Sequence, residues 1–129
     1  MNEQMIKDYL NQKKFAVIGS FRNEEKFAYK IFNKLRKNGY TVVPVNPAKK
    51  EVDGVKCYPK ITDIDDNVDV AVFVTPPKQT EKILCDCLDK NIKKVWFQPG
   101  AESKDAIEFC KKNNLNVVYG MCLLITSGN

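Results

Sequence analysis

The chain has 129 residues, the length of a single domain, and its 43% hydrophobic and 29% charged residues are typical of a globular protein. The net charge of +5 suits a polyanionic ligand, but the lysines form no dense block, so we expect no nucleic acid partner. No apolar run approaches the ~20 residues that cross a bilayer and the start lacks signal-peptide features, so we expect no membrane partner.

The first elements are predicted from periodicity and capping. Apolar residues in 5–10 form one stripe of a short amphipathic helix, and Phe15 to Ile18 read as a buried strand. Asn23 is a good N-cap and two acidic residues follow it, which predicts that a helix starts there. Gly39 ends this helix.

A second strand is predicted over 41–45, and Pro44 within it indicates an edge position or a local irregularity. Asp53-Gly54 predicts a turn, followed by a short strand over 55–58. The polar stretch 63–67 is typical of a short helix or turn.

The second half alternates more regularly. A strand is predicted over 69–74, followed by a helix that begins at Pro77 and has an apolar stripe of Ile83, Leu84, Cys87 and Leu88. A strand over 94–97, a helix over 103–113 and a strand over 116–119 follow. The tail over 121–129 is apolar at first and then polar. We interpret Trp96, within a strand, as a core residue.

This alternation predicts an α/β fold: one domain over 1–129, with a three-layer, Rossmann-like, doubly wound and mainly parallel sheet of about five or six strands and helices on both faces. Right-handed crossovers then bring the strand ends to one edge. We therefore expect four polar segments to converge on one crevice, the default ligand site: Gly19-Ser20, Asn46-Pro47, Thr75-Pro76-Pro77 and Gln98-Pro99-Gly100.

The end of the second strand indicates the class of ligand. An NAD site places a carboxylate there to hold the ribose hydroxyls. This chain has Asn46-Pro47-Ala48-Lys49-Lys50, which is neutral and then basic. The sequence therefore favours a nucleotide that carries an extra phosphate.

The chain contains no histidine, which excludes Ser-His-Asp and Cys-His catalysis, phosphohistidine transfer and histidine-bound metals. Its five cysteines are an odd number without a Cys-x-x-Cys pair, which favours a reduced, cytoplasmic protein. Cys85 and Cys87 would face different ways on a helix and make a poor metal pair, so we predict no metal site.

Two motifs are distinctive: Val45-Asn46-Pro47 after the second strand, and Trp96-x-Gln98-x-Gly100 after a later one. With KFAVIG at 14–19, EKFAYK at 25–30, GVKCYP at 54–59, VFVTPP at 72–77 and VVYGMC at 117–122, they resemble the small CoA-binding proteins, single-domain relatives of the N-terminal domain of the succinyl-CoA synthetase α chain. Phe21 departs from the pattern, because the family usually has a hydroxyl residue there.

The resemblance implies a Rossmann-like fold that holds coenzyme A or an acyl-CoA. The synthetase also has a second domain with a phosphorylated histidine, and this chain has neither, so we expect binding without catalysis. A homodimer or a partner enzyme both remain open.

The resemblance also implies roles. Backbone amides at Gly19 and Ser20 would cradle the diphosphate at a helix start, with Arg22 and Lys26 neutralising charge. Phe21 would stack on the ligand or shield it. Each residue also has a plain structural interpretation as a turn, cap or solvated side chain.

The other strand ends complete the expected site. Asn46 and Pro47 would border the adenine or ribose, and Lys49 and Lys50 would meet the 3′-phosphate. Thr75, Pro76 and Pro77 would form the opposite wall, and Gln98, Pro99 and Gly100 would line the pantetheine path.

Rival hypotheses remain at this point. One is an NADP-binding or redox-sensing Rossmann domain. Another is an interaction subunit that has lost its ligand, with Phe21 filling the pocket. A thioesterase or acyltransferase would lack an identifiable base. A further hypothesis is a mixed disulfide between CoA and Cys122 or Cys57, against the simpler interpretation of Cys122 as a buried thiol.

Overall fold

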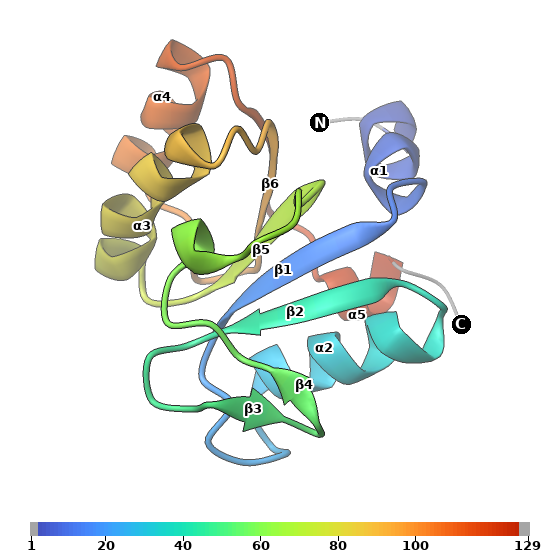
Figure 1. The fold of residues 1–129 in the computed structure, drawn as a ribbon. Coiled ribbons are helices and arrows are strands. Elements are labelled where there is room, and N and C mark those ends of the chain that lie inside the picture. The colour runs from blue at the N-terminus through green and yellow to red at the C-terminus, as the bar shows by residue number, and fades with distance from the viewer. Residues whose placement is uncertain (1–2, 127–129) are drawn as a thin grey trace.

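In the computed structural model, which describes residues 3–126, a five-stranded parallel sheet lies between two layers of helices (Figure 1). The strand order is β2-β1-β5-β6-β7. The strands are β1 (Lys14–Gly19), β2 (Thr41–Val45), β5 (Val70–Val74), β6 (Lys94–Phe97) and β7 (Asn116–Val118). The predicted three-layer, doubly wound α/β fold is confirmed.

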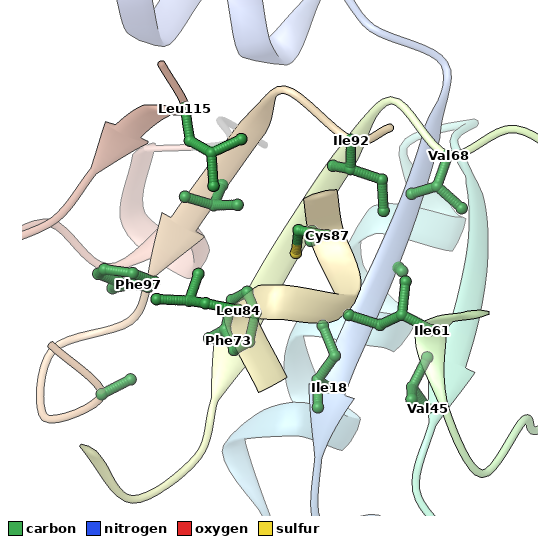
Figure 2. Close-up of a cluster of buried hydrophobic side chains, with 14 of the residues drawn as sticks. Ile18, Val45, Ile61, Val68, Phe73, Leu84, Cys87, Ile92, Phe97 and Leu115 are labelled. Atoms are coloured by element: carbon green, nitrogen blue, oxygen red, sulfur yellow. The ribbon is translucent and has the colours of Figure 1, made fainter. Parts of the chain in front are cut away.

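Each face of the sheet packs against its own set of helices. One face carries α3 (Pro77–Asp89), α4 (Lys104–Lys112) and the 3-10 turn η1 (Ile61–Asp63), and the other carries α1 (Glu3–Leu10), α2 (Phe27–Lys37) and α5 (Leu123–Thr126). Figure 2 shows the first core, in which Ile18 and Phe73 of the sheet lie near Leu84 of α3. The second core contains Phe15 and Trp96, and Trp96 is fully buried as predicted.

The order of the strands creates a switch point between β1 and β5. From β1 the chain goes to β2 on one side, and then crosses to β5 on the other side. The loops that follow β1 and β5 therefore leave in opposite directions, and a crevice opens at the carboxyl ends of the strands between them. The register aligns Ile18 with both Val45 and Phe73, so the three strands end at nearly the same level.

Strand β2 is the edge of the sheet, as Pro44 predicts. Beyond it, Tyr58 makes a parallel bridge to Val45: its N–H donates to the Pro44 carbonyl, and its carbonyl accepts from the Asn46 N–H. The chain between β2 and this bridge forms a small antiparallel hairpin of β3 (Glu51–Val52) and β4 (Val55–Lys56). Its turn uses positive φ angles at Asp53 and Gly54.

Three local predictions are wrong. Helix α2 begins at Phe27 and not at Asn23, because the Asn23 side chain accepts a hydrogen bond from the Glu25 N–H within a turn. Leu88, placed in the apolar stripe of α3, is 36% exposed. The short helical turn is η1, which overlaps the polar stretch 63–67 only at Asp63.

Among residues 3–126, no helix combines the length and hydropathy of a membrane span, and no group of three or more cysteine, aspartate or glutamate side chains is arranged to hold a metal. The first two residues of the N-terminal segment and the last three of the tail lie outside the described residues.

Gly19 allows a close approach between the end of β1, helix α2 and strand β5. A Cβ atom at this position would lie 2.7 Å from the Ala28 Cβ of α2 and 2.8 Å from the Val74 carbonyl oxygen of β5. Neither neighbour is a flexible side-chain end. Glycine at the end of β1 therefore lets α2 and β5 meet at the switch point.

We predict that Gly19→Ala lowers the free energy of unfolding by about 1–3 kcal/mol, because the added methyl group must displace packed backbone. Chemical denaturation measures this loss. Ala28→Gly removes one of the two clashing atoms. The double variant Gly19→Ala/Ala28→Gly should therefore lose less free energy of unfolding than the two single variants lose together. Strict additivity would show that Ala28 and position 19 are not in contact.

Candidate functional site

The crevice at the switch point is a pocket of about 420 Å³. Six of the residues predicted from the strand ends line it together: Gly19, Ser20, Asn46, Pro47, Thr75 and Pro76. They come from the carboxyl ends of β1, β2 and β5, where parallel strands place their loops on one edge.

Sequence reasoning missed the other side of this crevice. Pro59, Lys60 and Ile61 reach it because the bridge between Tyr58 and Val45 carries the chain along the sheet edge. Gln79, Ile83 and Asp86 reach it from α3. Their spacing of four and three residues places them on one helix face, a signal that was available in the sequence but was not used.

Asn46 ties the ends of two strands together. Its side-chain Nδ2 donates to the Gly19 carbonyl oxygen at 2.5 Å, and its Oδ1 accepts from the Ala48 N–H at 2.7 Å. The side chain therefore bridges β1 to the loop after β2. This bridge holds the rim of the crevice in shape before any ligand binds.

A smaller pocket of about 180 Å³ lies beside the crevice and shares Ser20 and Asn46 with it. It is also lined by Arg22 and Lys49, both exposed, so positive charge gathers next to the end of β1. The Ser20 hydroxyl accepts a hydrogen bond from the Arg22 N–H at 3.5 Å.

Phe21 borders this smaller pocket, but its ring belongs to the core. The residue is 4% exposed, and its ring packs edge-on against Phe32 of α2 with 5.8 Å between the ring centroids. Because the ring packs in the core against α2 and does not line the main crevice, it does not fill that crevice.

Three predicted site residues line neither the crevice nor a pocket next to it. Lys26 is the N-cap of α2 and makes no side-chain capping bond, Lys50 lies just before β3, and Pro77 is the first residue of α3. Lys50 uses its backbone carbonyl to accept from the Cys57 N–H, which anchors the hairpin.

The ends of β5 and β6 form a third pocket of about 240 Å³, lined by Thr75 and Pro76 together with Gln98, Pro99 and Gly100. Gln98 is 5% exposed, and its side chain is occupied within the protein: Oε1 accepts from the Leu123 N–H at 2.7 Å, and Nε2 contacts the Cys122 sulfur at 3.3 Å. Gln98 therefore anchors α5, while the loop after it remains available to line a ligand path.

Two cysteine thiols contact these loops: Cys57 is a poor nucleophile, and Cys122 is only partly accessible. Cys57 is buried, its thiol points to the Asn46 carbonyl oxygen at 3.5 Å, and burial raises its pKa. Cys122 is half-buried beside Gln98. A raised pKa reduces the thiolate fraction at neutral pH, which disfavours disulfide chemistry at Cys57.

Asp86 is the carboxylate of the crevice. It is half-buried, and loss of hydration raises its pKa, while the charge of Lys60 across the pocket opposes this shift. The crevice therefore has a neutral and basic rim at the strand ends and an acidic group on α3.

Comparisons with known proteins agree on one family. The model of the CoA binding domain matches residues 13–127. The ADP-forming acetate–CoA ligase of Methanocaldococcus jannaschii is 36% identical over 86% of this chain and 17% of its own length. A conserved hypothetical protein of Pyrococcus furiosus has a TM-score of 0.84 at 36% identity, covering 88% of this chain and 98% of that one.

A hypothetical protein of Pyrococcus horikoshii has a TM-score of 0.93 at 31% identity, covering 98% of this chain and 89% of that one. The chain therefore matches nearly the whole of two small proteins. It spans less than a third of the ligase relatives, for instance 28% of the α subunit of a Pyrococcus furiosus acetate–CoA ligase.

We predict that Asn46→Ala lowers the free energy of unfolding by about 1–2 kcal/mol, because it removes both hydrogen bonds that join the strand ends. Denaturant titration is the measurement. Asn33→Ala is the matched control, since the Asn33 side chain makes no hydrogen bond to any residue the structure describes. Equal stability of Asn46→Ala and wild type would show that the bridge is not needed.

Proposed function

The chain belongs to the CoA-binding domain family, and we propose that it binds coenzyme A or an acyl-CoA in the crevice without catalysing a reaction of its own. The observation that supports this most directly is the chemistry of the rim. The ends of β1 and β2 meet there, residues 46–50 contain no carboxylate, and Arg22 and Lys49 lie beside Ser20. This arrangement suits an adenine nucleotide with more negative charge than NAD.

The three pockets suggest how the ligand lies. The adenosine occupies the 420 Å³ crevice, bordered by Asn46 and Pro47. The diphosphate lies at Gly19 and Ser20, with Arg22 and Lys49 close by, whereas Lys26 and Lys50 lie outside these pockets. The pantetheine then crosses Thr75 and Pro76 towards the loop 98–100.

We propose that any chemistry on the bound thioester is carried out elsewhere. The chain has no histidine, so a phosphohistidine route is not available to it. The ligase relatives are much longer than this chain, and some are named as α subunits. A partner enzyme is therefore one proposal for the protein's context in the cytoplasm, and a homodimer is the other.

A second candidate is an NADP-binding domain, because a basic segment after β2 also suits a ribose 2′-phosphate. The first βα turn disfavours it. That turn has one glycine, Gly19, where the dinucleotide fingerprint has three.

Titration calorimetry with CoA, dephospho-CoA, NAD and NADP should give the tightest binding for CoA, with dephospho-CoA about tenfold weaker because a charge-assisted contact is lost. Tighter binding of NADP than of CoA would support the second candidate. No binding of any of the four would contradict the proposal.

Charge reversal at Lys49 tests the placement of the phosphates. We expect Lys49→Glu to weaken CoA binding by about tenfold at low salt and by less at high salt, because the contact is exposed and screened. Lys50→Glu is the matched control, since it makes the same charge change outside the pocket. Equal effects of the two variants would show that the net charge, and not a contact at Lys49, attracts the ligand.

A further inference from the structure

We propose that Asp86 determines the specificity of the crevice for adenine, by accepting a hydrogen bond from the exocyclic 6-amino group of the base. This inference rests on the proposed function and deepens it, because it assigns a base-reading residue to a helix that the strand-end argument does not include.

Asp86 lines the same crevice as the strand ends, but it lies further towards the C-terminal end of α3 than the other lining residues of this helix. Gln79, Ile83 and Asp86 line the pocket from one face of the helix. With a helical rise of about 1.5 Å per residue, Asp86 lies about 10 Å beyond Gln79 along the axis. A ligand whose diphosphate is at Gly19 and Ser20 therefore extends its nucleoside towards Asp86.

The walls before Asp86 suit a flat, largely apolar base. Ile83 comes from α3, and Pro59 and Ile61 come from the segment beyond the edge strand. Figure 2 shows Ile61 close to Ile18 and Val45 in the first core, and all three residues also line the crevice. A purine between these side chains is held by apolar contact and presents its polar edge to the end of the pocket.

The carboxylate of Asp86 lacks a donor from the protein. Within residues 3–126 it accepts no hydrogen bond and forms no ion pair, although it is half-buried. The three charged groups that act on it are Lys60, Asp89 and Asp63, and burial raises its pKa. A partly desolvated acceptor without a partner gains from a ligand that brings a donor.

Lys60 completes the pattern at this end of the crevice. It lines the pocket from the opposite wall and makes no ion pair with Asp86 among the described residues. Asp86 thus offers an acceptor and Lys60 a donor. The adenine edge carries the complementary pair, the 6-amino donor and the N7 acceptor, whereas guanine and hypoxanthine place an acceptor oxygen at position 6.

The test compares CoA with its inosine analogue, in which a 6-oxo group replaces the 6-amino group. By calorimetry, the wild-type protein should bind CoA at least about tenfold more tightly, since the analogue turns a charge-assisted hydrogen bond into a contact between two acceptors. In Asp86→Asn the side-chain amide can donate to the 6-oxo group, so the preference should disappear.

Asp89→Asn is the matched control, because Asp89 is on the same helix, carries the same charge and is exposed outside the crevice. It should keep the wild-type preference. A thermal melt of each variant checks that it is folded.

Equal binding of CoA and the analogue by the wild-type protein, or an unchanged preference in Asp86→Asn, overturns this inference and leaves the proposed function standing. Failure of the wild-type protein to bind either compound overturns the proposed function itself.

Discussion

The structure depends on the close contact between β1, β5 and α2 at Gly19. Without a side chain at that position, the Ala28 methyl group and the Val74 carbonyl oxygen can both approach the end of β1. The Asn46 side chain then ties the Gly19 carbonyl to the loop after β2. Three strand ends are thereby fixed within one small region, and the crevice opens directly above them. Hydrogen bonds within the chain restrict the conformation of this rim, which lowers the entropy cost of binding a ligand there.

Most of the fold could be predicted from the sequence because its signals are local. Apolar runs predicted the strands and Pro44 predicted the edge position. The helix predicted over 103–113 is α4, and the structure adds that the Ser103 side chain caps it by accepting from the Ala106 N–H. The start of α2 was missed because Asn23 can satisfy a turn as well as a helix, and nothing local decides between them. Packing of Ala28 against Gly19 is a tertiary constraint, and it is met by a helix that begins at Phe27.

The site was predictable where it follows from topology and unpredictable where it follows from packing. Parallel strands end on one edge, so Gly19, Asn46 and Thr75 could be grouped in advance. Pro59 and Lys60 join them only through the bridge made by Tyr58, a contact between distant segments. The sequence also did not predict that the side chains of Phe21 and Gln98 point into the protein. The direction of a side chain depends on which neighbours offer it space or hydrogen bonds.

The central claim is that one edge of the sheet, and no other surface, receives the nucleotide. A ¹H–¹⁵N correlation spectrum recorded during a CoA titration tests it most directly. The account predicts that the largest shifts fall on the amides of 19–22, 46–50, 75–76 and 98–100, together with the side-chain amide of Asn46. Shifts centred on the opposite ends of the strands, near Lys14 and Asn116, or on the outer face of α2, would contradict it.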